Sequence, residues 1–315
     1  MEHLASRRKL WYTISLLVLV PGLVFLVLFG LNLGIDFTGG SAWEIQFDRQ
    51  VSTEAIRATL AENGRPEAQV QQIGDEEDHT YLIRMRELHE GSAEKAALTE
   101  ALGENGTLNP SREALNTVGG SVATSIGQRS LLAVAAASVG VLLYIAWAFR
   151  NTQNPLLYGI CAIVAMLHDA LLVVGVFAIL GVVADIEVDA LFVTALLTVI
   201  GFSVHDTIVV FDRIRENLNA RVAPTFEEVV NYSIAQTIVR SLNTSLTVVI
   251  TLLALYLFGG STTREFVLAL LIGLISGTYS SIFNASQLLV SWENGEIQGL
   301  FNRIFRRRSP SPASA

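Results

Sequence analysis

The sequence predicts a membrane protein: an all-α bundle of six spanning helices, with one inserted α+β domain outside the membrane. Composition is the first observation, because 315 residues that are 51% hydrophobic and 16% charged carry more apolar surface than one soluble core can bury. Second, six largely uncharged runs are long enough to cross a hydrocarbon layer, which takes about 20 helical residues. Third, about a hundred residues between the first two runs have the composition of a soluble domain.

The spans follow in chain order. Arg7, Arg8 and Lys9 precede the first run, which is too long for a signal peptide and has no convincing cleavage site after it, so it is expected to remain as an anchor. The six spans are predicted at 11–31, 131–149, 156–183, 190–211, 241–258 and 266–290. The chain then divides into an N-terminus (1–10), the first span (11–31), an extramembrane domain (32–129), spans two to six (130–292) and a basic, partly disordered tail (293–315).

Basic residues predict the orientation, because Lys and Arg near span ends resist export. Eleven of the 21 Lys and Arg residues lie on the side of the two termini, whereas the short connections opposite hold only Arg264. Both termini and the tail are therefore expected in the cytoplasm, where the arginines of the tail suit anionic headgroups of the lipid bilayer. The exported domain holds sixteen acids against eight bases, which argues against a nucleic-acid partner.

The exported domain has the element order βαββαβ. Partly alternating apolar and polar residues predict strands at 42–47, 68–73, 80–85 and 114–118, with helices at 53–63 and 92–104. Ser52 is the expected N-cap of the first helix. This order predicts a ferredoxin-like sheet with both helices on one face. His79 and His89 lie among charged residues without a nucleophile or a ligand set, so no catalytic constellation is expected there.

Ionisable residues at membrane depth are the candidate functional residues, since placing one there costs several kcal/mol. His168 and Asp169 fall midway along the third span, and His205 and Asp206 fall in the cytoplasmic half of the fourth. The single cysteine, Cys161, reads as a small buried hydrophobe, and no metal-ligand spacing occurs in the sequence, so neither a metal nor a cofactor is expected.

Polar stripes mark the fourth and fifth spans. Residues 225–228 read as a capping box, so the fifth helix is expected to begin before the membrane and to carry Arg240 about four turns along it. Helical spacing aligns Ser203, Asp206, Thr207 and Val210 on one stripe, and Arg240, Thr244, Thr247 and Thr251 on another. Both stripes are expected to face protein or trapped water, with Arg240 paired to Asp206. A static ion pair that only holds helices together explains the same residues about equally well.

Small residues predict close helix contact at the sixth span. Gly273 and Gly277 lie one turn apart, with Ser276, Ser280 and Ser281 nearby. Such a face allows two helix backbones to approach each other.

Two motifs resemble a known family. Residues 34–41 (GIDFTGGS), just after the first span, look like a signature of the bacterial Sec export subunits SecD and SecF. Residues 201–217 (GFSVHDTIVVFDRIREN) closely resemble the fourth-span motif of the SecF branch. Residues 167–169, Arg240 and residues 258–260 fit as well, so the resemblance runs from the first span to the sixth. The sequence departs from the family at His205, where Asn is common, and at Gly120, where Pro is usual.

The resemblance implies one half of a resistance-nodulation-division transporter in the bacterial inner membrane, with SecD as the other half. Such a complex uses the proton-motive force to help complete preprotein movement through the SecYEG translocon, on the periplasmic side. Protons, or sodium in their place, would be the coupling ion, and no cofactor is implied. By motif position Asp206 would bind and release the proton, and Arg240 would be the cation tied to its charge. The residues that would support this relay are Asp169, His168, His205, Ser203, Thr207 and Thr244; His168 and His205 are expected to have packing or hydrogen-bonding roles.

Two other functions stay open. A passive assembly subunit would use the same charges only to hold helices together. A small-molecule or lipid transporter of the same superfamily would need a substrate cleft, and the single small exported domain gives no sign of one.

Overall fold

The computed structural model describes residues 4–73, 76–150, 152 and 154–297, and the chain divides into two compact units. The first unit comprises the residues up to 31, residues 134–186 and the residues from 194 onward. The second comprises residues 32–133 together with residues 187–193. The short segment before the fourth span therefore belongs to the extramembrane unit, which the sequence did not reveal.

Six helical segments of the described chain are long and apolar enough to cross a membrane, which confirms a multi-pass membrane protein. The first begins with a short 3-10 turn (η1, Ala5–Arg7) and continues as α1 (Arg8–Phe29). The next four are α5 (Gly120–Ala148), α6 (Pro155–Val183), α7 (Ala190–Asn219) and α8 (Phe226–Phe258). The sixth consists of α9 (Ser261–Ser280), a π-helical turn (η4, Ser281–Ala285) and α10 (Ser286–Glu293). The expected cap of α8 is present: the Thr225 hydroxyl accepts the Glu228 amide at 3.3 Å.

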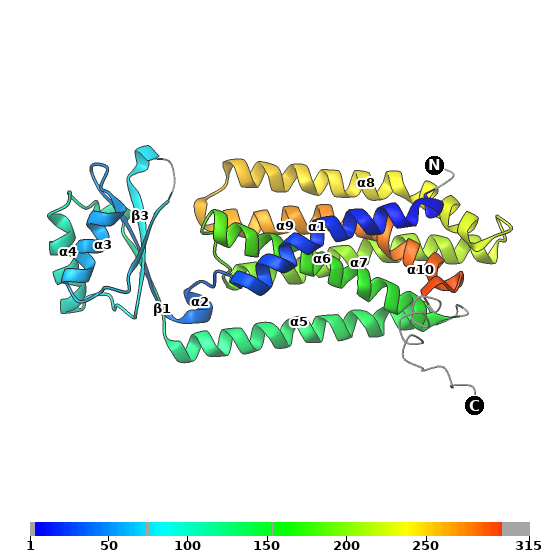
Figure 1. Cartoon of the computed structure of the whole chain (residues 1–315), viewed down its shortest axis with the longest axis horizontal. Helices are drawn as coiled ribbons and strands as arrows, with labels where there is room; N and C mark the ends of the chain where they lie inside the picture. Colours follow the sequence, from blue (N-terminus) through cyan, green and yellow to red (C-terminus); the bar gives the residue numbers. More distant parts are fainter. Residues whose placement is uncertain (1–3, 74–75, 151, 153, 298–315) are drawn as a thin grey trace, which may run out of the picture. The chain divides into compact units, whose positions relative to one another are not determined.

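The membrane unit is built around α6 and α9. Helix α1 packs on α6, α6 packs on α9, and α8 packs on α9 (Figure 1). Gly22 of α1 meets Gly175 of α6 so closely that a Cβ on Gly22 would lie 2.8 Å from the Gly175 Cα. The fifth-span helix α8 has only 6% of its most apolar stretch buried, against 61% for the sixth span, so the described part of the chain leaves one face of α8 uncovered.

The extramembrane unit contains a four-stranded antiparallel sheet of order β2-β3-β1-β4. The strands are β1 (Gly40–Gln46), β2 (Gln69–Ile73), β3 (Thr80–Met85) and β4 (Ala114–Val118). Helices α3 (Thr53–Glu62) and α4 (Ala93–Gly103) cover one face (Figure 1), and two short 3-10 turns, η2 (Glu76–Asp78) and η3 (Pro110–Arg112), join the elements. This is the expected ferredoxin-like arrangement, because the order follows from two split βαβ units.

One hydrophobic core holds the sheet to its helices. Trp43 of β1 lies opposite Ile83 of β3, and both are fully buried with Leu60 of α3 and Leu102 of α4. Ser52 caps α3 as expected, since its hydroxyl accepts the Ala55 amide at 3.2 Å. The helix positions were therefore set by local capping, and the buried face by the alternation along the strands.

The double glycine of the GIDFTGGS motif has a structural reason. A one-turn helix, α2 (Ile35–Thr38), ends at Gly39, whose φ is +73°. Gly40 follows with φ +114°, and a Cβ there would lie 2.6 Å from the Met85 carbonyl oxygen. Both positions use backbone conformations that L side chains rarely adopt. The next residue, Ser41, is fully buried, and its hydroxyl accepts the Leu88 amide at 2.7 Å.

Candidate functional site

Asp169 of α6 is a fully buried carboxylate surrounded by hydroxyl donors. Ser203 of α7 and Ser280 of α9 donate to Oδ2 at 2.6 and 2.5 Å, and Ser276 of α9 donates to Oδ1 at 2.6 Å. The His168 Nδ1 lies 3.1 Å from Oδ1. A carboxylate offers about four acceptor positions, so these four partners fill them. Three spans thus meet at one acidic group.

Small residues on α9 allow this meeting. Ser276 and Ser280 are four residues apart and share a helix face, with Gly277 between them. A Cβ on Gly277 would lie 3.2 Å from the Ser203 Cβ, and one on Gly273 would overlap Val199 of α7 at 2.1 Å. The close contact expected at these glycines is confirmed, and it is made with α7 of the same chain.

A hydroxyl network continues from Asp169 along α7. The Thr207 hydroxyl donates to the Ser203 carbonyl at 3.0 Å and lies 2.8 Å from the Ser281 hydroxyl. Ser281 also donates to the Ser203 carbonyl, at 3.1 Å. Ser281 begins the π-helical turn η4, an irregularity that is frequent at functional sites. The expected stripe of Ser203, Asp206 and Thr207 therefore does face the bundle.

Asp206 has a different environment, although it lies only one turn beyond Ser203 on α7. Its side chain is half-buried, and the Ser245 hydroxyl of α8 hydrogen-bonds to it. Ser245 in turn accepts a hydrogen bond from Thr278 of α9 at 2.6 Å. Helix α9 therefore contacts both carboxylates, Asp169 directly and Asp206 through Ser245.

The expected ion pair between Asp206 and Arg240 does not form within the described part of this chain. Arg240 is exposed on α8, and so are Thr244 and the rest of its stripe, whereas Ser241 and Ser245 lie on the buried side. Successive helix residues point about 100° apart, so packing of Ser241 and Ser245 against the bundle turns Arg240 outward. Among the described residues, the Thr244 hydroxyl hydrogen-bonds only within its own helix, to the Arg240 carbonyl at 2.9 Å.

The two histidines also differ. His168 has the expected hydrogen-bonding role through Asp169, and its Nε2 is buried without a hydrogen-bond partner among the described residues. His205 is exposed, so the packing or hydrogen-bonding role expected for it is not seen in the described part of the chain. The proton-relay roles of all these side chains stay predictions.

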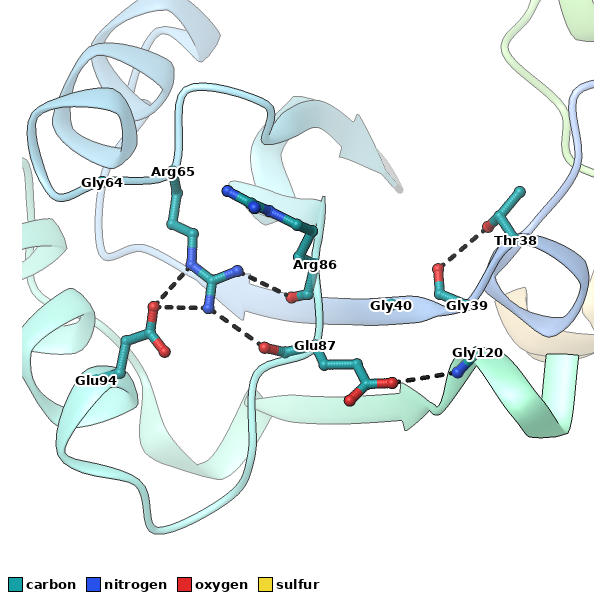
Figure 2. Close-up of a pocket in the computed structure, with 9 residues that line it drawn as sticks. All are labelled: Thr38, Gly39, Gly40, Gly64, Arg65, Arg86, Glu87, Glu94 and Gly120. Carbon is teal, nitrogen blue, oxygen red and sulfur yellow. Dashed lines mark hydrogen bonds and ion pairs between the residues drawn. The ribbon is translucent and has the colours of Figure 1, made fainter.

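A cavity of about 590 Å³ opens in the extramembrane unit (Figure 2). Its central side chain is Arg65, which is 7% exposed and pairs with Glu94 at 2.6 Å. The same guanidinium donates to the Arg86 and Glu87 carbonyls at 3.2 and 3.3 Å, and the Glu87 carboxylate accepts the Gly120 amide at 3.2 Å. These groups satisfy one another, and the cavity is lined by no nucleophile with a neighbouring base, so we assign it a structural role.

Sequence reasoning missed how completely Asp169 is enclosed. It named Ser276 and Ser280 as packing residues and Ser203 as a relay residue, but did not bring them to one carboxylate. The available signal was the four-residue spacing of two serines in an otherwise apolar span.

Comparison with known proteins agrees with this architecture. Residues 97–295 match the family "Protein export membrane protein SecD/SecF, C-terminal", and residues 24–51 match the "SecD/SecF GG Motif". The protein translocase subunit SecF of Thermobaculum terrenum is 55% identical over 314 residues, which are 98% of each chain. SecDF of Bacillus subtilis is 36% identical over 297 residues, 93% of this chain but 38% of the relative.

The solved structures give the same result. The crystal structure of SecDF from Thermus thermophilus, described as a translocon-associated membrane protein, superimposes with a TM-score of 0.79 at 33% identity. The match covers 92% of this chain and 38% of that one, so the chain spans about two fifths of the SecDF length. Six candidate spans, the ferredoxin-like domain and the two matched motifs lead to one assignment: the chain belongs to the SecD/SecF family of protein translocase subunits, on its SecF branch.

Proposed function

We propose that this chain is the SecF-type half of a proton-driven complex that, with SecD, helps preproteins leave the SecYEG translocon on the periplasmic side. Both termini then lie in the cytoplasm, and residues 32–129 lie in the periplasm of a bacterial inner membrane. One observation carries the proposal: Asp206 is a half-buried carboxylate in a span, held by one hydroxyl and by no Lys or Arg of the described chain. Such a group can gain or lose a proton without breaking a completed network, unlike Asp169.

The exposed face of α8 supports a partner. An arginine facing lipid at membrane depth costs several kcal/mol, so the Arg240 stripe requires a polar cover, which the described residues of this chain do not provide. The SecDF relatives continue well beyond the part that this chain matches, as a covering half would require. We therefore assign the cover to SecD, with Arg240 close enough to Asp206 in the assembled complex to respond to its charge.

The driving force would be modest for each proton. A potential of 100 mV is worth about 2.3 kcal/mol for one full charge crossing, so movement must be coupled efficiently to the site. Helix α9 is suited to this coupling, because Thr278 reaches Asp206 through Ser245 while Ser276 and Ser280 hold Asp169. Protonation of Asp206 would weaken its hold on Ser245 and allow α8 and α9 to shift.

A passive assembly role is the second candidate, and the hydrogen-bonding groups around Asp169 favour it. Four filled acceptor positions make a static joint between α6, α7 and α9, with no need for proton exchange. In that case the acids of both spans would serve stability alone.

Asp206→Asn separates the two functions. The variant removes the charge and keeps the size, so proton coupling predicts normal co-purification with SecD, loss of export in cells lacking their own SecF, and loss of proton uptake in proteoliposomes. Asp212→Asn is the matched control, because Asp212 lies on the same helix but pairs with Arg215 at 2.5 Å on an exposed surface. Normal export and proton uptake by Asp206→Asn would refute the proton-coupling role. Repeating the uptake with a sodium gradient identifies the coupling ion.

A further inference from the structure

The N-terminal end of α7 is held by the segment that carries the GIDFTGGS motif, within the extramembrane unit. Leu33 and Val188 form a parallel β-bridge. The Val188 amide donates to the Asn32 carbonyl at 2.8 Å, and the Gly34 amide donates to the Val188 carbonyl at 2.9 Å. We call residues 32–36 together with 187–190 the clamp.

Asp36 completes the clamp at the first residue of α7. Its Oδ2 accepts the Ala190 amide at 2.9 Å, and the Asp189 carboxylate accepts the Phe192 amide at 2.8 Å. Helix N-termini leave four amides without helical partners, and here two carboxylates from different parts of the chain take two of them. Negative charge at this end of a helix also interacts favourably with the helix dipole.

An ion pair ties the clamp to the sheet. Arg84 of β3 lies 2.6 Å from the Glu187 carboxylate, and each side chain is 16% exposed. Arg84 projects from the sheet face opposite Ile83, away from the core under α3 and α4. Tight spacing adds to the fit, because a Cβ on Gly34 would lie 3.3 Å from the Glu187 Oε2.

Helix α7 then runs without a break from Ala190 to Asn219 and carries both Ser203 and Asp206. At about 1.5 Å per residue, Asp206 lies about 24 Å along this helix from the clamp. A continuous helix transmits displacement of one end to the other far better than a flexible linker does. Within the extramembrane unit, the first residues of α7 are thus tied to the sheet through one cap, one β-bridge and one ion pair.

We propose that Asp36 is a positioning residue for α7, and that the clamp makes the exported sheet and the start of α7 move as one body during the transport cycle. The proposal rests on the proposed function, since it concerns how movement of the ion-site helix reaches the exported domain. It gives the acid of the GIDFTGGS motif a task distinct from that of the two glycines, which shape the turn into β1.

Hydrogen exchange tests the cap independently of transport. In the full chain, Asp36→Ala removes the acceptor of the Ala190 amide, so exchange in a peptide covering 187–193 is expected to accelerate about five-fold, the ratio for a lost cap of ~1 kcal/mol. Asp36→Asn keeps one acceptor oxygen, and is expected to restore most of the protection. Glu62→Ala, on the exposed end of α3, is the control. Unchanged exchange in Asp36→Ala, or no rescue by Asn, would overturn the positioning role.

A cross-link tests the single-body movement. Leu33→Cys and Val188→Cys are combined with Cys161→Ala, so that the bridged pair holds the only cysteines. Neighbouring strands are about 4.8 Å apart, which suits a disulfide. Oxidation is expected to leave export and proton uptake within about two-fold of the reduced protein. Loss of export on oxidation, recovered with reductant, would show that the clamp opens in the cycle and would refute the proposal, as would failure to cross-link. Failure of the proton role itself would instead show in Asp206→Asn, with the exchange result unaffected.

Discussion

Replacing Asp169 tests whether the hydrogen bonds that it accepts from three serine hydroxyls stabilise the bundle. Asp169→Ala removes the acceptor of three serine hydroxyls, but Ser280 also lies 3.2 Å from the Gly277 carbonyl and can use it instead. Two buried donors, Ser203 and Ser276, then lose their acceptor. Each unsatisfied buried donor costs about 1–3 kcal/mol, so the free energy of unfolding is expected to fall by about 2–6 kcal/mol.

Asp169→Asn should cost less, about 1–3 kcal/mol, because its amide oxygen can serve Ser203 and Ser280 together. The amide nitrogen would then face Ser276 and His168, both of which can accept a hydrogen bond. The predicted order of stability is wild type, then Asn, then Ala.

The assay is unfolding of the purified protein by SDS in mixed micelles, followed by helix content and tryptophan fluorescence. Ser138→Ala is the control, since the one described partner of the Ser138 hydroxyl is the Val134 carbonyl of its own helix, at 2.8 Å. Loss of this hydroxyl should change the free energy of unfolding by less than ~0.5 kcal/mol. Wild-type stability of Asp169→Ala, or an Asn variant weaker than Ala, would refute the reasoning.

Three further changes have defined outcomes. Gly22→Ala forces a methyl to 2.8 Å from the Gly175 backbone, which cannot rotate away, so the same SDS titration should show a loss of about 1–3 kcal/mol. Ser41→Ala leaves the buried Leu88 amide without its hydroxyl acceptor and should lower the free energy of unfolding of the extramembrane unit by about 1–3 kcal/mol. Burial raises the pKa of Glu187 despite Arg84, so the contribution of Glu187 to the free energy of unfolding should decrease as pH rises from about 4 towards 7. Glu187→Gln should therefore reduce the dependence of the free energy of unfolding on pH.

The sign of the pH effect follows from proton binding. A carboxyl whose pKa is raised in the folded state holds more protons there than in the unfolded chain, between the two pKa values. The contribution of Glu187 to the free energy of unfolding is therefore fully present below the pKa of the unfolded state, about 4.3. It is lost as pH rises through the pKa of the folded state. If Glu187→Gln shows the same dependence of the free energy of unfolding on pH as the wild type, this reasoning is wrong.

The control for Gly22→Ala is Gly140→Ala, because a Cβ on Gly140 would meet open space.

The sequence determined the features that depend on neighbouring residues. Hydropathy over about 20 residues located six spans, alternation located the strands, and Ser52 and Thr225 marked helix starts, because each signal is carried by residues within a few turns of one another. The candidate carboxylates were also visible, since an acid inside an apolar run stands out by composition alone.

Only the tertiary structure decided which groups meet these acids. The hydroxyls on Asp169 come from positions 34, 107 and 111 residues away, and the amide capped by Asp36 is 154 residues away. No local period encodes such pairings, because they depend on how each helix is rotated about its own axis when it packs. The same rotation turned Arg240 outward, since α8 buries Ser241 and Ser245 against this chain and leaves its arginine on the uncovered face.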